Sequence, residues 1–135
     1  MNGIIVRLIY RKGNKMYKDI FEFQDKNATK AERINAFGQM TLSEAKRMIQ
    51  TCGTPQGKLY YTELLNESFS EKWTIEEYKE LIKYCLMHFM SWPEFHNNPE
   101  NSQERIEQED YYIHCAYSEK ESPMAAAVEV GFGCG

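Results

Sequence analysis

The segment Ile4–Gln24 constrains the fold most, because its turn signal and its hydrophobic pattern predict the same β-hairpin. Gly13 and Asn14 form a two-residue turn signal of the Gly-first kind, with runs rich in Ile, Val, Tyr and Phe on both sides. If these two residues are the loop, counting outward places Tyr10 opposite Tyr17. A slip of one residue would move every side chain to the other face. We therefore predict a hairpin in this register.

One face of the predicted hairpin mixes apolar side chains with basic ones: Ile5, Ile9, Met16 and Ile20 with Arg7, Arg11 and Lys18. Such a face is too apolar to be fully solvated and too basic to be an ordinary core. Two interpretations stay open. Either helices cover the face while the Arg and Lys stems extend to water, or the face is an interface with a protein, an anionic ligand or a second copy. A homo-oligomer formed through this face is one expectation.

Asp19 falls on the other face of the hairpin, opposite Leu8 and among apolar and aromatic neighbours. A buried carboxylate without a partner costs free energy. Asp19 therefore either reaches solvent at a sheet edge or pairs with a Lys or Arg, or it makes a polar contact inside a pocket or interface. Both interpretations stay open.

Three Thr-x-x-Glu sequences have the spacing of a capping box, and they begin at Thr29, Thr41 and Thr74. Apolar residues at helical spacing follow the second and third boxes. These patterns predict a helix over 42–51 and a main helix that starts after Thr74 and ends at Trp92-Pro93. After the first box, a short helix to about residue 36 and an extended segment over 33–40 fit equally well.

The remaining apolar segments alternate, which is typical of strands: 58–65, 110–117 and 125–132. The segment Glu94–Asp110 holds six acidic residues and one Arg, so we predict a long exposed loop with room for a short helix over 103–107. Together these elements predict one α+β domain over residues 1–135. It would contain an antiparallel or mixed sheet of about five strands, with the N-terminal hairpin and two main helices packed on the sheet.

Cysteine and histidine give no strong site. The four cysteines are widely separated, as expected for reduced thiols of a cytoplasmic protein. A zinc site can be drawn from Cys85, His88, His96 and the pair His114-Cys115. Structural zinc usually takes two close ligand pairs, which are absent here, and Cys85 falls in the middle of an apolar helical stripe. The sequence contains no phosphate-binding glycine loop and no run of about 18 apolar residues, and we expect no signal peptide. We expect no metal, no cofactor, no catalytic residue and no membrane contact.

Charge is unevenly distributed. Residues 1–33 carry a net +4, whereas the other 102 residues carry a net −8. This excludes a uniformly basic nucleic-acid binder. Small size and missing catalytic signatures favour a non-catalytic protein that modulates or inhibits a macromolecular partner, either a protein or a protein–nucleic-acid complex. The residue usage is typical of low-GC bacterial and phage genes, so an anti-defence protein of a phage or mobile element is one form of this hypothesis. The acidic segment would then face a basic groove.

Two other functions stay open. A protein that binds or sequesters an anionic, nucleotide-type small molecule would use aromatic rings for stacking and Arg side chains for phosphate. An enzyme without a short motif would use His114, Asp19 or Glu63 for acid–base chemistry. The candidate ligand-binding residues are Arg7, Arg11, Lys18, Asp19, Tyr112 and His114.

Overall fold

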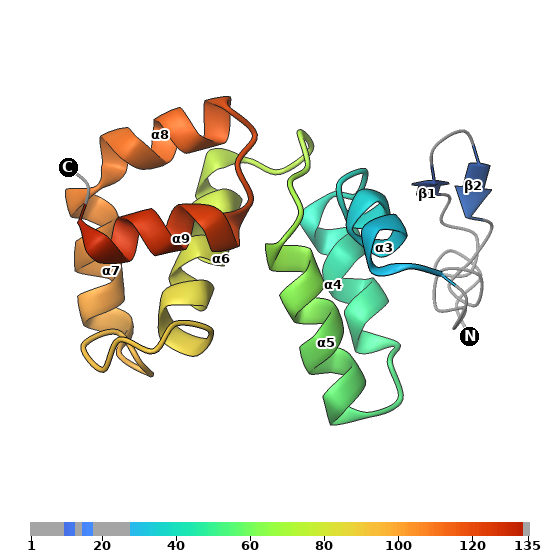
Figure 1. Ribbon diagram of the computed structural model, residues 1–135, viewed down its shortest axis with the longest axis horizontal. Coiled ribbons are helices and arrows are strands. Elements are labelled where there is room, and N and C mark those ends of the chain that lie inside the picture. Colours follow the sequence, from blue (N-terminus) through green and yellow to red (C-terminus); the bar gives the residue numbers. More distant parts are fainter. Residues whose placement is uncertain (1–9, 13–14, 18–27, 134–135) are drawn as a thin grey trace. The chain divides into compact units, whose positions relative to one another are not determined.

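Figure 1 shows a computed structural model of the chain, which describes residues 10–12, 15–17 and 28–133. These residues form two short strands, β1 (Tyr10–Lys12) and β2 (Lys15–Tyr17), and the following helices: α3 (Lys30–Phe37), α4 (Leu42–Gln50), α5 (Pro55–Asn66), α6 (Ile75–His88), α7 (Pro99–Gln108), α8 (Asp110–Ser118) and α9 (Pro123–Phe132). The chain divides into two compact units, one ending at Lys72 and the other beginning at Trp73. Each unit is described by itself.

The prediction of an α+β fold with a five-stranded sheet is wrong. The three later segments that were expected to be strands, 58–65, 110–117 and 125–132, lie in α5, α8 and α9. Apart from β1 and β2, the regular structure of the described residues is helical.

Strands β1 and β2 pair in antiparallel fashion, with Tyr10 opposite Tyr17, Arg11 opposite Met16 and Lys12 opposite Lys15. These three pairs have the register that the Gly-Asn turn signal predicts. The rest of the expected hairpin, including its mixed face, lies outside the described residues.

The three capping boxes are confirmed. Thr29 Oγ1 accepts a hydrogen bond from the Glu32 backbone N–H at 3.1 Å, and the Glu32 carboxylate accepts one from the Thr29 N–H at 2.7 Å. The same reciprocal bonds start α4 at Thr41 and α6 at Thr74. The first box therefore starts a helix, which decides between the two interpretations of residues 33–40 in favour of α3 over 30–37.

A second kind of helix start was missed. Thr54-Pro55, Asn98-Pro99 and Ser122-Pro123 each place a capping side chain directly before a proline at the first helical position. Proline suits this position because its missing N–H has no helical partner and its φ is already helical. Pro55 begins α5 in this way, directly after its capping residue Thr54.

In the first unit, α5 packs against both α3 and α4 (Figure 1). The core between them is apolar and fully buried, and its largest members are Phe37, Met40, Met48 and Leu64. At its border, the Arg33 guanidinium lies 5.6 Å from the centre of the Tyr61 ring. Burial of that ring raises the pKa of the Tyr61 hydroxyl.

In the second unit, α6 and α9 form the central pair, and α7 and α8 pack around them (Figure 1). The largest buried side chains are Trp73, Tyr78, Ile82, Leu86 and Ile113. Two tyrosine hydroxyls connect distant parts of this unit, because Tyr117 donates to the Trp73 carbonyl and Tyr78 donates to the Glu121 carbonyl at 2.8 Å.

Helix α9 packs closely against its neighbours because several of its residues are small. Ala126 and Ala127 are fully buried, and the ring of Trp92 lies over Gly131, where a Cβ atom would come within 2.2 Å of the ring. None of the helices in the described part of the chain combines the length and the hydropathy that crossing a bilayer requires.

Candidate functional site

The acidic segment that was expected to be a loop contains helix α7, which is twice the length of the helix allowed for it. Glu100, Glu104 and Glu107 lie at i, i+4 and i+7 on this helix, so they share one face, and all three are exposed. Ser102 and Ile106 are buried on the opposite face. The helix therefore presents a stripe of carboxylates to water while its apolar side packs on the core.

Glu94 is also exposed and lies in the loop that precedes α7. Together with the three carboxylates of α7, it forms what we call the acidic surface: Glu94, Glu100, Glu104 and Glu107. Residues 73–135 hold twelve Asp or Glu and only four Lys or Arg, a net charge of −8.

Two of the four basic side chains have other partners. Lys79 Nζ lies 2.5 Å from Asp110 Oδ1. Arg105 turns away from the stripe, and its Nη1 donates to the carbonyls of Val130 and Gly131 at 3.1 and 2.8 Å. A cation at the C-terminus of a helix is favourable because the last carbonyls carry partial negative charge. The Arg105 guanidinium thus binds the C-terminal carbonyls of α9.

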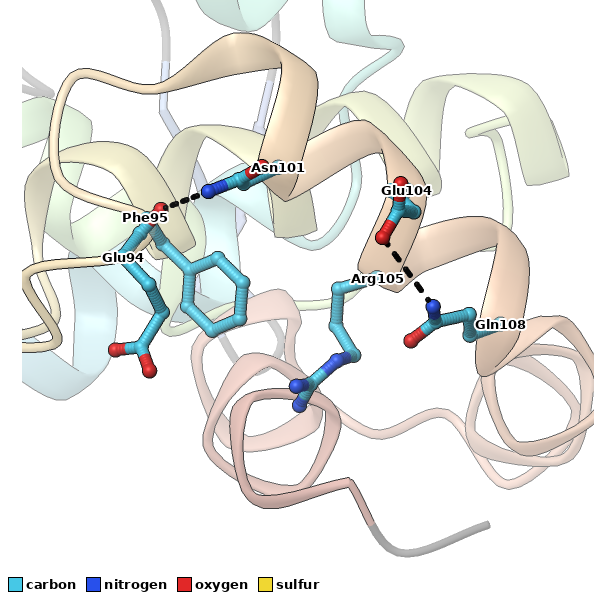
Figure 2. Close-up of a pocket in the computed structure, with 6 residues that line it drawn as sticks. All are labelled: Glu94, Phe95, Asn101, Glu104, Arg105 and Gln108. Atoms are coloured by element: carbon cyan, nitrogen blue, oxygen red, sulfur yellow. Dashed lines mark hydrogen bonds between the residues drawn. The ribbon is translucent and has the colours of Figure 1, made fainter.

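A pocket of about 240 Å³ opens beside the acidic surface (Figure 2), and its lining residues are Glu94, Phe95, Asn101, Glu104, Arg105 and Gln108. The Phe95 ring is buried, and the Arg105 guanidinium lies 5.1 Å from its centre. In the view of Figure 2, Glu94 lies on one side of this aromatic–guanidinium pair, while Glu104 and Gln108 lie on the other.

Side chains of α7 hold the wall of the pocket in place. Asn101 Nδ2 donates to the Glu94 carbonyl at 3.1 Å, and Ser102 Oγ donates to the Phe95 carbonyl at 3.3 Å. The side chain of Asn98 accepts from the Asn101 N–H at 3.0 Å and so caps the helix. The loop and the helix that line the pocket are therefore joined directly.

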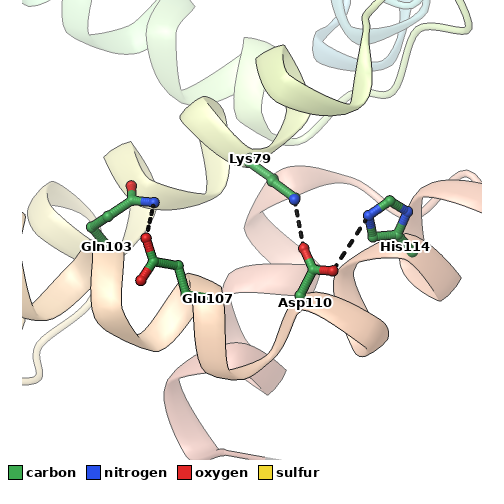
Figure 3. Close-up of polar contacts among 5 residues, drawn as sticks. All are labelled: Lys79, Gln103, Glu107, Asp110 and His114. Carbon is green, nitrogen blue, oxygen red and sulfur yellow. Dashed lines mark hydrogen bonds and ion pairs between the residues drawn. The ribbon is translucent and has the colours of Figure 1, made fainter.

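Beyond α7, Asp110 begins α8 and contacts two basic side chains (Figure 3). Besides Lys79, the His114 Nε2 lies 3.6 Å from its Oδ2. The hydrogen bond from Lys79 lowers the pKa of the Asp110 carboxyl, with further contributions from the charges of Lys79 and His114. Figure 3 also shows Gln103, whose Nε2 donates to Glu107 at 3.2 Å along α7.

Two of the six predicted ligand-binding residues can be located, and they do not share a face. The sequence placed Tyr112 and His114 on one side of a strand, but on helix α8 residues two apart point in different directions. The Tyr112 hydroxyl donates to Glu121 Oε1 at 3.0 Å, whereas the His114 side chain is 54% exposed beside Asp110. Arg7, Lys18 and Asp19 lie outside the described residues, as does the side chain of Arg11. Their ligand role stays a prediction.

Within residues 28–133, no group of three or more His, Cys, Asp or Glu is arranged to hold a metal ion. The zinc ligands that can be drawn from the sequence are therefore not brought together. Cys85 is fully buried on α6, and burial raises the pKa of its thiol. A reduced, neutral cysteine in this environment packs as a small apolar residue.

The sequence was interpreted as an exposed acidic loop over 94–110, and the helix that arranges its glutamates as a stripe was missed, although its signal is present in the sequence. The Glu residues at 100, 104 and 107 have helical spacing, and Asn98-Pro99 marks where the helix begins. The role of Arg105 had no such signal, since its partners lie 25 and 26 residues further along the chain.

Comparisons of the chain with protein-family models, with curated proteins and with solved structures found no match.

Proposed function

We propose that this protein is a non-catalytic binding protein that occupies a basic, nucleic-acid-binding surface of a partner protein through its acidic surface. The observation that carries the proposal is the carboxylate stripe of α7, which has no basic side chain positioned to neutralise it among the described contacts. Lys79 forms an ion pair with Asp110, and Arg105 donates hydrogen bonds to carbonyls of α9.

The stripe has a cost when the protein is alone. Like charges at i, i+3 or i, i+4 destabilise a helix by about 0.2–0.5 kcal/mol per pair. Glu104 stands in this relation to both Glu100 and Glu107. A positively charged partner would convert this repulsion into attraction and would also accelerate association, because complementary fields steer encounter.

The backbone that carries the carboxylates is well anchored. Ile106 is buried in the core of the second unit, and Arg105 bonds to the end of α9. A surface that is already ordered loses less conformational entropy on binding. This supports a docking function for α7 over that of a solvated connection.

The test compares charge variants of the full chain, purified gently from a low-GC bacterial host and analysed by native mass spectrometry. The first variant is E100Q/E104Q/E107Q. The matched control is E76Q/E119Q/E129Q, which removes three exposed carboxylates elsewhere in the second unit and changes the net charge equally. We expect wild type and control to retain a basic partner protein, and the α7 variant to bind it about tenfold more weakly, since exposed charge pairs contribute about 0.2–1 kcal/mol each.

Added nucleic acid should release the partner from the wild-type complex, because both would compete for one basic surface. Equal loss of the partner from both triple variants would show a general charge effect and contradict the proposal. Retention of a nucleotide-sized adduct without any partner protein would instead favour the small-molecule binder. An inhibitory role against a host defence system stays a prediction.

A further inference from the structure

We infer that the pocket on the acidic surface receives the side chain of one arginine from the partner protein. This inference rests on the proposed function and adds to it the chemistry of a single recognition point.

The size of the pocket fits one long side chain. Its volume is about 240 Å³. Pockets for whole small-molecule ligands generally measure about 300–1,000 Å³. A protruding side chain is therefore a better occupant than a nucleotide or a cofactor.

The polar lining favours a cation with several donors. Glu94 and Glu104 supply two carboxylates, and Asn101 and Gln108 supply side-chain amides. Glu104 accepts only a long hydrogen bond, 3.4 Å, from Gln108, which an incoming donor can displace. A guanidinium offers five N–H donors in a planar arrangement that matches carboxylate oxygens, whereas an ammonium is a compact and strongly hydrated point charge.

Arg105 does not cancel this preference. Its guanidinium donates to two carbonyls at the end of α9, whose partial negative charge offsets part of its own. With two carboxylates and one partly compensated cation, the pocket keeps a negative balance. An anionic ligand would face both carboxylates and would find Nη1 of Arg105 already used.

The aromatic cluster that continues from Phe95 of the pocket lining would contact the residue next to the arginine. The Trp92 ring lies 6.2 Å from the Phe95 ring and 5.2 Å from the Phe132 ring. Phe132 is 72% exposed, so the ring that packs on Trp92 offers apolar surface to solvent. Aromatic residues of this kind are common at the energetic centres of interfaces.

The experiment titrates the ¹⁵N-labelled full chain with Nα-acetyl-arginine amide and follows its NMR signals. The side-chain NH₂ groups of Asn101 and Gln108 serve as reporters inside the pocket. The comparison probes are the corresponding amides of citrulline, which is neutral and nearly isosteric, and of lysine. We expect saturable shifts at millimolar concentration with the arginine probe, at least threefold weaker binding of the lysine probe, and no saturable shift with the citrulline probe.

Two double variants locate the binding. E94Q/E104Q removes both pocket carboxylates and should lower the affinity for the arginine probe at least fivefold. E100Q/E107Q removes two charges from the same acidic surface outside the pocket lining, and it should change the affinity less than twofold. Dispersed backbone spectra of both variants show that they are folded.

Several results would overturn the inference: no saturable shift with the arginine probe, equal shifts with citrulline or lysine, equal effects of the two variants, or shifts that bypass Asn101 and Gln108. Such a result, together with a partner protein that still binds wild type and not E100Q/E104Q/E107Q, would remove the arginine pocket alone. A different result would overturn the proposed function: equal retention of the partner protein by E100Q/E104Q/E107Q and by its control E76Q/E119Q/E129Q.

Discussion

Gly131 lies within α9 directly under the ring of Trp92. A Cβ atom at this position would come 2.2 Å from Cζ3 of the ring, well inside contact distance. The ring has little room to retreat, since it packs against Phe95 and Phe132. In a solvent-exposed helix, the change from Gly to Ala would raise the free energy of unfolding by up to about 1 kcal/mol. At this position the steric conflict outweighs that gain.

We predict that G131A lowers the free energy of unfolding of the second unit by about 1–3 kcal/mol, the usual cost of overpacking. In a W92A background the same change should become stabilising, by up to about 1 kcal/mol, because only the helix propensity remains. Urea unfolding followed by tryptophan emission measures both effects. Trp73 and Trp92 are the two tryptophans of the chain, so the emission reports residues 73–135. Equal effects in the two backgrounds would contradict this account.

At the scale of the element, Ser122 begins α9 by accepting a hydrogen bond from the Ala125 N–H at 3.2 Å, with Pro123 at the first helical position. We predict that S122A destabilises the second unit by about 1 kcal/mol, and that S122G costs only a few tenths. The same urea titration measures the difference. If residues 125–132 were a strand, as the alternating sequence suggests, neither change would remove a cap and both would be close to neutral.

The helices that sequence analysis identified are those with an unambiguous start. Thr41 and Thr74 open capping boxes ahead of long apolar stripes, and α4 and α6 follow them. Helix α8 lacks such a signal, because Glu109 makes no side-chain cap bond there. Its sequence, with three Tyr and one Ile, fits the alternation of a strand as well as helical spacing. Only Ile113 and Ala116 are buried. Tertiary packing decides its structure, and a single sequence does not contain that information.

For the whole molecule, charge divides along the same boundary as structure. Residues 1–72 carry a net +4 and residues 73–135 a net −8. The sequence was sufficient to predict an exposed acidic segment after the main helix. The glutamate spacing and Asn98-Pro99 also carry the signal of the helix, but the sequence was not sufficient to predict that Arg105 is withdrawn from the acidic stripe. The position of Arg105 depends on contacts with α9 that are distant in sequence.

The start of the second unit has a consequence for proteolysis. Trp73 is buried, and its carbonyl accepts a hydrogen bond from the Tyr117 hydroxyl. Trypsin must hold several extended residues on both sides of the bond that it cuts, so cleavage after the exposed Lys72 requires Trp73 to leave the core. We predict that Y117F increases cleavage after Lys72 roughly fivefold, since one hydrogen bond contributes about 1 kcal/mol.

Mass spectrometry of the early fragments measures this rate, and cleavage after Lys46, in the first unit, provides the internal reference. An unchanged ratio of the two cleavage rates would mean that the Tyr117 hydroxyl does not protect the peptide bond after Lys72. The Tyr117 hydroxyl, 44 residues further along the chain, therefore holds Trp73 in place and protects the peptide bond after Lys72. A truncation that removes α8 would expose this bond to proteases and shorten the lifetime of the fragment that remains.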